Sequence, residues 1–331
     1  MRSDRGFDPF SGNPGAVWFR VAVVVSLAGV ALAALVSGAS ARPTGVPTLY
    51  AYAAGRASSP TGCPETSATS KRCSLAEALS EAVAGATVAL ATPGSRGHYV
   101  GNWAVNTPAT TASAPLTIEP APGVDDATLD GNHGELAGCQ TSTCGGPVIT
   151  VDPGVHLELG GVSIENARDS GVASNGDGGA IYNGGGTLSV SGSTFSSDSA
   201  EADGGAIDNA DRGRGGTLSV SGSTFSGNSA GGEGGAIDNA DNDGKGTLTV
   251  SASTFSANSA ASEGGAIDNA DNGGSGALTV SDSTFSGNHA KSLAGGVTGA
   301  SADDGAIAGS GPISVSDSTF SGNTTGEGGT P

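Results

Sequence analysis

The chain has few large side chains for its length. Of its 331 residues only 4% are aromatic and one is Met, whereas 58 are Gly. A compact core draws most of its stabilisation from large apolar side chains, so a single globule of this length would bury too little apolar area. The composition therefore argues against an ordinary globular domain and favours an architecture whose short units each need only a few aliphatic residues.

Basic residues are scarce as well. The 13 Lys and Arg residues are outnumbered by 32 Asp and Glu residues, which gives a formal net charge of -19. Nucleic acids and anionic membrane surfaces are bound by basic patches, so neither is an expected partner. Direct binding of an acidic polysaccharide is also disfavoured unless a divalent cation bridges the two molecules.

A block of 30 residues recurs from about residue 178 to the C-terminal end. The residues that mark this interval are Phe195, Phe225, Phe255 and Phe285, with Leu188, Leu218, Leu248 and Leu278. A period in the range of roughly 20–50 residues indicates stacked units whose neighbours complete one another's core. The repeat therefore predicts a solenoid.

Apolar and polar residues alternate within each repeat. Leu218 and Val220 are predicted to point inwards, with Thr217 and Ser219 outwards, while Phe225 and Ile237 supply the inward residues of two further faces. Three short strands per coil predict a right-handed parallel β-helix whose coils stack at about 4.8 Å.

Identical residues on successive coils are expected to form rows. The predicted rows are Phe195, Phe225, Phe255, Phe285 and Phe320 in the interior, and Asn228, Asn258, Asn288 and Asn323 at a corner. The Asn amides are expected to hydrogen-bond along their row.

The first 41 residues read as a signal peptide. Arg residues precede an apolar run from Val21 to Val36, and Ala39 and Ala41 give the small-x-small cleavage pattern, so the mature chain is predicted to begin near Arg42. An uncleaved membrane anchor is the alternative, because a run of about 16–18 residues lies at the lower edge for a spanning helix. Cleavage would give a secreted or cell-surface protein with no membrane span.

Residues 42–115 differ from the repeats and are predicted to form an N-terminal cap. A capping box at 74–77 predicts one amphipathic helix over about 74–84, flanked by short strands at 48–53 and 87–91. Such a helix would protect the open edge of the first coil. The β-helix itself is predicted to occupy residues 116–331.

The four cysteines form two close pairs in the sequence. Disulfides between Cys63 and Cys73 and between Cys139 and Cys144 are predicted, as in an exported protein. A metal site is disfavoured, because the histidines are scattered without a spaced partner for zinc or for a catalytic triad. These histidines are His98, His133, His156 and His289.

Two tetrapeptides recur in the repeats, Gly-Gly-Ala-Ile at 204–207, 234–237 and 264–267, and Phe-x-x-Asn at 225–228, 255–258 and 285–288. Together they resemble the paired tetrapeptides of polymorphic outer-membrane proteins and related pectin-lyase-like β-helices. Residues 73–78, Cys-Ser-Leu-Ala-Glu-Ala, resemble the CSLREA-type N-terminal segment of bacterial exported β-helix proteins, with Ala76 in place of the Arg of that motif. The resemblance implies an exported parallel β-helix with an adhesin-like role.

Aspartates also recur at the repeat interval. Asp208, Asp238 and Asp268 occupy one predicted outward position on consecutive coils; Asp211, Asp241 and Asp271 follow three residues on. We call the first three the aspartate file. Stacked carboxylates repel one another, so the file is expected either to face water or to hold a hard cation such as Ca²⁺. The sequence leaves both interpretations open, and no other cofactor is expected.

The favoured function is a non-catalytic, adhesin-like solenoid that binds a matrix component, a glycan or a surface protein through many weak contacts along one face. Outward Ser and Thr rows would offer a hydroxylated surface, although such residues are also ordinary choices for an exposed sheet. The open edge of the last coil is expected to favour end-to-end association.

The alternative is an extracellular polysaccharide lyase or glycoside hydrolase of pectin-lyase-like fold. A lyase would need a base near a cation-binding cluster, and Arg212, Arg214 and Lys245 lie in the loop after the aspartate file. The sequence assigns no catalytic residue.

Overall fold

The computed structural model describes residues 46–53, 73–92, 98–107, 110–125, 127–131, 145–171, 175–210, 212–270, 273–291 and 305–326. The chain divides into two compact units, Met1–Ala41 and Arg42–Pro331. The first unit lies outside the described residues, so the signal peptide and its cleavage stay predictions. Among the described residues no helix is long and apolar enough to cross a membrane.

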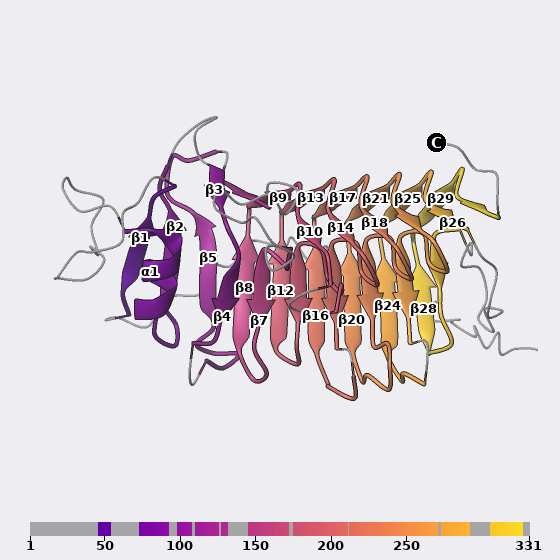
Figure 1. Ribbon diagram of the computed structural model, residues 1–331, viewed down its shortest axis with the longest axis horizontal. Helices are drawn as coiled ribbons and strands as arrows, with labels where there is room; N and C mark the ends of the chain where they lie inside the picture. The colour runs from indigo at the N-terminus through magenta and orange to yellow at the C-terminus, as the bar shows by residue number, and fades with distance from the viewer. Residues whose placement is uncertain are drawn as a thin grey trace, which may run out of the picture. The chain divides into compact units, whose positions relative to one another are not determined.

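The second unit is a β-helix whose coils cross four parallel sheets in turn (Figure 1). The first sheet consists of β1 (Thr48–Ala51), β2 (Thr87–Leu90), β5 (Leu116–Pro120), β8 (His156–Gly160), β12 (Thr187–Ser191), β16 (Thr217–Ser221), β20 (Thr247–Ser251), β24 (Ala277–Ser281) and β28 (Ile313–Ser316). The second sheet consists of β3 (His98–Val100), β6 (Thr128–Asp130), β9 (Ser163–Glu165), β13 (Thr194–Ser196), β17 (Thr224–Ser226), β21 (Thr254–Ser256), β25 (Thr284–Ser286) and β29 (Thr319–Ser321).

The two remaining sheets are made of shorter strands. The third sheet consists of β10 (Arg168–Asp169), β14 (Ser199–Ala200), β18 (Ser229–Ala230), β22 (Ser259–Ala260), β26 (His289–Ala290) and β30 (Thr324–Thr325). The fourth sheet consists of β4 (Trp103–Val105), β7 (Ile149–Val151), β11 (Ile181–Asn183), β15 (Ile207–Asn209), β19 (Ile237–Asn239), β23 (Ile267–Asn269) and β27 (Ile307–Ala308).

The predicted right-handed parallel β-helix is confirmed, but the prediction of three strands per coil was wrong. The third sheet is the addition, and its strands are only two residues long. Two residues are too few for a period-two pattern to stand out in a sequence.

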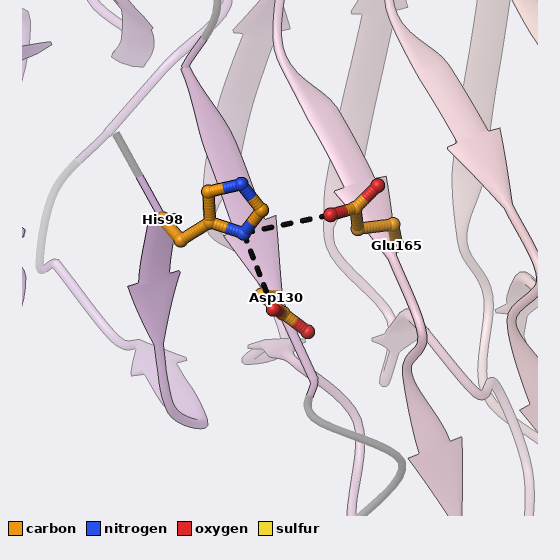
Figure 2. A group of neighbouring side chains, drawn as sticks. All are labelled: His98, Asp130 and Glu165. Carbon is orange, nitrogen blue, oxygen red and sulfur yellow. Dashed lines mark hydrogen bonds and ion pairs between the residues drawn. The ribbon is translucent and has the colours of Figure 1, made fainter. Parts of the chain in front are cut away.

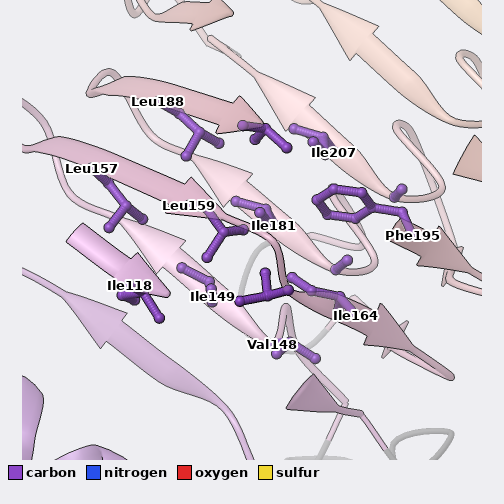
Figure 3. Packing of buried hydrophobic residues seen from close by; sticks show 14 of the residues in the cluster. Ile118, Val148, Ile149, Leu157, Leu159, Ile164, Ile181, Leu188, Phe195 and Ile207 are labelled. Atoms are coloured by element: carbon purple, nitrogen blue, oxygen red, sulfur yellow. The ribbon is translucent and has the colours of Figure 1, made fainter. Parts of the chain in front are cut away.

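The 30-residue period sets the register between coils. Leu218 lies opposite Leu248, and Phe225 opposite Phe255. The predicted Phe row is confirmed: neighbouring ring centroids are 4.6 to 4.9 Å apart and their planes lie within 4° of parallel. Figure 3 shows side chains from the first, second and fourth sheets meeting in the interior, which forms one continuous apolar core.

The predicted Asn row is confirmed as well. The Asn228 Nδ2 donates to Asn258 Oδ1 at 3.0 Å, and the same bond joins Asn258 to Asn288 at 2.9 Å and Asn288 to Asn323 at 2.9 Å. A second amide row, which was not predicted from the sequence, runs along the fourth sheet through Asn183, Asn209, Asn239 and Asn269. In each row the buried amides are hydrogen-bonded to one another, which satisfies polar groups that would have no partner in an apolar core.

The predicted helix is present but shorter than expected. Helix α1 spans Leu75–Glu81, with Ser74 as its N-cap, and the predicted capping box is confirmed. Its last residue is Glu81, and the C-cap residue Ala82 has an extended backbone, so residues 82–84 lie outside the helix. Its buried residues join the core beside β1 and β2 at one end of the stack (Figure 1).

The strands of the predicted cap are already part of the β-helix. β1 pairs with β2, and β2 pairs with β5 in the first sheet. β3 and β4 likewise open the second and fourth sheets. Residue 115, where the cap was predicted to end, therefore falls within one continuous stack of strands.

Only one of the four cysteines lies among the described residues. Cys73 is 3% exposed, and its backbone forms an isolated parallel β-bridge with Ala51 of β1. Cys63, Cys139 and Cys144 lie outside the described residues, so the pairings Cys63–Cys73 and Cys139–Cys144 stay predictions.

Candidate functional site

A cluster of one histidine and two carboxylates lies on the outer face of the second sheet. His98, Asp130 and Glu165 come from β3, β6 and β9, three neighbouring strands. The middle residues of these strands are buried, so alternation turns the flanking residues outwards. These middle residues are Tyr99, Leu129 and Ile164, each 2% exposed or less.

One imidazole nitrogen faces both carboxylates. His98 Nδ1 lies 3.2 Å from Asp130 Oδ2 and 3.5 Å from Glu165 Oε1 (Figure 2). The side chains are 40%, 17% and 32% exposed, so the cluster is half-buried and open to solvent on one side.

The two carboxylates occupy the same register position, because Asp130 lies opposite Glu165. Two negative charges about 4 Å apart repel by about 1 kcal/mol in bulk water and more at a protein surface. A cation held between the two carboxylates would offset that repulsion.

This cluster was not predicted from the sequence, in which His98 has no partner at a spacing typical of zinc sites or catalytic triads. Asp130 and Glu165 follow His98 at 32 and 67 residues, and neither interval matches the regular repeat. One signal was available: Thr-Leu-Asp and Ser-Ile-Glu stand where the later repeats read Thr-Phe-Ser.

The aspartate file is buried, so its predicted outward position was wrong, and the interpretation of a row facing water does not apply. Asp208, Asp238 and Asp268 lie opposite one another in the fourth sheet and are 1%, 0% and 0% exposed. Asp241 is 1% exposed, whereas Asp211 and Asp271 lie outside the described residues.

The Gly-Gly turn before each strand explains this burial. Gly234 has a positive φ of 61°, and a Cβ there would clash with the carbonyl oxygen of Ile237 and the amide nitrogen of Asp238. The turn therefore folds back against the strand that follows it, and only glycine fits. Both faces of the strand are covered, so alternation no longer separates buried from exposed residues.

Asp238 has the most unusual environment within the file. Neither of its carboxylate oxygens has a hydrogen-bond partner among the described residues. Burial raises the pKa of Asp238 well above its usual range, and the neighbouring Asp208, Asp268, Asp203 and Asp241 raise it further. A proton or a cation would relieve this charge, so calcium at the aspartate file stays a prediction.

Of the basic residues suggested for a lyase, Arg212 forms an ion pair. Its Nη2 lies 2.7 Å from Oδ2 of Asp177, a side chain only 3% exposed. The Arg212 guanidinium therefore neutralises a buried carboxylate, a role in stabilising the fold rather than in catalysis.

The match to a family model agrees with the predicted repeat. Residues 222–240 and 252–270 match the Chlamydia polymorphic membrane protein repeat. Two solved structures are similar. Pectate lyase Pel9A has 15% sequence identity and a TM-score of 0.37, and the alignment covers 83% of this chain and 79% of the lyase. Alginate lyase from Paenibacillus sp. str. FPU-7 has 16% identity and a TM-score of 0.37, and the alignment covers 85% of this chain and 99% of that lyase. A search of curated proteins found no similar sequence.

The chain is thus a parallel β-helix repeat protein, and two of its repeats are similar to the Chlamydia polymorphic membrane protein repeat, as its recurring tetrapeptides predicted. Nothing about its chemistry follows from the two lyase structures.

Proposed function

We propose that this protein is a non-catalytic, adhesin-like array at the cell surface or outside the cell, and that its first sheet binds an extracellular glycan or a surface protein. The observation that carries the proposal is a regular hydroxyl face on that sheet. We define the hydroxyl face as the exposed residues Thr217, Ser219, Thr247, Thr249 and Thr279.

The residues of the hydroxyl face are held in register. Ser219 lies opposite Thr249, and Thr249 opposite Thr279, while the Leu and Val residues between them point into the core. Parallel pairing spaces successive hydroxyls at about 4.8 Å along the stack. Such a surface repeats one weak hydrogen-bonding unit at fixed intervals without ordering any loop.

A repetitive ligand suits a repetitive face. Each hydroxyl can both donate and accept a hydrogen bond, as a sugar hydroxyl also does. Individual contacts in water are weak, but several on one rigid surface add to useful avidity. The match to a polymorphic membrane protein repeat supports a surface location, and the predicted signal peptide would provide export.

The test is binding of the full-length chain to immobilised extracellular polysaccharides and to whole cells. Ser219→Ala, Thr249→Val and Thr279→Val together remove three hydroxyls with little change of shape. The matched control is Thr224→Val, Thr254→Val and Thr284→Val, which removes three hydroxyls from the second sheet.

Loss of binding in the first triple variant alone, with the melting temperature preserved, is the expected result. Equal binding by both variants, or no binding by the parent, would contradict the proposal. Release of unsaturated or shortened sugars from any polysaccharide would instead establish the enzyme alternative.

A further inference from the structure

We propose that His98, Asp130 and Glu165 bind one divalent transition-metal ion of the zinc type on the outer face of the second sheet. The site is separate from the hydroxyl face and does not depend on it. Three observations support it: the distances between the donor atoms, their chemical type and their place in the repeat.

The distances fit a small tetrahedral ion. Ligand atoms bonded to Zn²⁺ at about 2.0 Å lie about 3.3 Å apart at neighbouring corners of a tetrahedron. His98 Nδ1 lies 3.2 Å from the Asp130 oxygen and 3.5 Å from the Glu165 oxygen, and the three donor atoms all lie within 4.8 Å of one another. A modest approach of the two carboxylates would complete three corners.

The donor atoms favour zinc over calcium or magnesium. Imidazole nitrogen with carboxylate oxygen is a donor set that zinc and its neighbours in the periodic table accept, whereas calcium and magnesium take oxygen ligands. The two carboxylates and a neutral imidazole would balance the charge of a divalent ion. Since both carboxylates face Nδ1, this nitrogen is the ligand.

The repeat provides an internal comparison. Glu165 lies opposite Ser196, and the same register position on later strands is occupied by Ser226, Ser256, Ser286 and Ser321. Carboxylates occur at this position on β6 and β9, the two strands nearest His98. Ser at this position on β6 and β9 would have been enough for a polar surface, so the two carboxylates indicate a more specific role.

The site would keep one coordination position open. Its three ligands come from three hydrogen-bonded strands, so the backbone already holds their Cβ atoms in place. Because His98 remains 40% exposed, a fourth corner would be free for water or for a donor atom from a bound molecule.

The experiment measures zinc binding by the full-length chain, purified without a histidine tag and freed of metal. Competition with a chromophoric chelator gives the affinity and the number of ions. Parent protein is expected to bind one Zn²⁺ that excess Ca²⁺ does not displace. His98→Ala and the nearly isosteric Glu165→Gln are each expected to weaken binding at least about tenfold.

The matched control is His289→Ala, which removes another surface imidazole, one that contacts Thr324 at 2.9 Å. It should bind zinc as the parent does. Co²⁺ bound to the parent should give the visible absorption of a tetrahedral site, and this absorption should be absent in Glu165→Gln. Parental affinity in either ligand variant, or displacement of zinc by Ca²⁺, would overturn the proposal.

Discussion

Asp238 is a residue whose environment is expected to lower the stability of the folded protein. It is fully buried among other carboxyl groups, and neither oxygen has a hydrogen-bond partner among the described residues. The amide row at the next position of the same strands shows the contrast. There, Asn209 donates to Asn239 at 2.6 Å, and Asn239 to Asn269 at 2.7 Å. An amide can donate and accept, whereas an ionised carboxylate can only accept.

Asp238→Asn is therefore expected to stabilise the protein at pH 7 by about 1–3 kcal/mol, because the amide can donate to the carboxyl groups above and below it. Burial raises the folded-state pKa above the ordinary value of 3.8, so the folded state binds more protons than the unfolded state above that pH. The contribution of Asp238 to stability is thus complete below about pH 4 and is lost as the pH rises.

Urea unfolding at a series of pH values checks this prediction. The variant should show a shallower fall in stability between pH 4 and pH 7 than the parent, on a background set by other buried carboxyls. Burial also raises the pKa of Asp198, and that of Asp169 to about 6. The control is Asp282→Asn at an exposed position, where stability should stay within about 0.5 kcal/mol of the parent.

The same variant tests calcium at the aspartate file. A bound ion would stabilise the folded state by mass action, so millimolar Ca²⁺ would raise the melting temperature of the parent. Asp238→Asn removes one negative charge from the file, which weakens Ca²⁺ binding there, and should reduce that rise. Equal shifts in parent and variant would place any calcium elsewhere.

At the scale of elements, α1 depends on its first turn. It has seven residues, which is too short for a stable isolated helix in water, so capping and packing must hold it. The Glu77 amide donates to Ser74 Oγ at 3.2 Å, and the Ser74 amide donates to Glu77 Oε2 at 2.8 Å. These reciprocal bonds satisfy backbone donors that the helix itself leaves unpaired.

Ser74→Ala is expected to destabilise the protein by about 1 kcal/mol, the usual cost of losing an N-cap. Ser80→Ala is the control, since its hydroxyl only donates to the Glu77 carbonyl on the exposed side of the helix. Hydrogen exchange should locate the change: the amides of α1 and β1 should exchange faster in Ser74→Ala alone. Uniformly faster exchange along the β-helix would contradict a local role for the cap.

For the second unit as a whole, stability is expected to depend on position along the stack. In a solenoid each coil contacts only its neighbours, so an interior coil has two stabilising interfaces and a terminal coil has one. Phe255 is fully buried between Phe225 and Phe285, whereas Phe320 is partly exposed and, among the described residues, stacks only on Phe285.

Phe255→Ala should therefore cost about 3–5 kcal/mol, since it leaves a cavity inside the row. Phe320→Ala should cost about 1–2 kcal/mol, because part of that ring is already in water. Urea denaturation followed by circular dichroism measures both. Similar losses for the two variants would show that position along the stack does not set the cost.

Much of this protein could be predicted from the sequence because its repeats are regular. A fixed 30-residue interval places equal residues at equal positions on successive coils, which was enough to predict the β-helix, the Phe row and the corner Asn row. The capping box could also be predicted, because it involves only residues 74–77, which are close in the sequence. Periodicity works here because parallel pairing carries each side chain directly onto its counterpart.

Other features depended on tertiary structure. The burial of Asp238 follows from a Gly-Gly turn that covers the outer face of the strand. The alternation of residues along a strand does not predict whether its outer face is covered. His98, Asp130 and Glu165 meet because three irregular early coils happen to bring them to one face, across intervals that no repeat predicts. A repeat determines what recurs, whereas a site made of single, unlike residues is decided only when the coils stack.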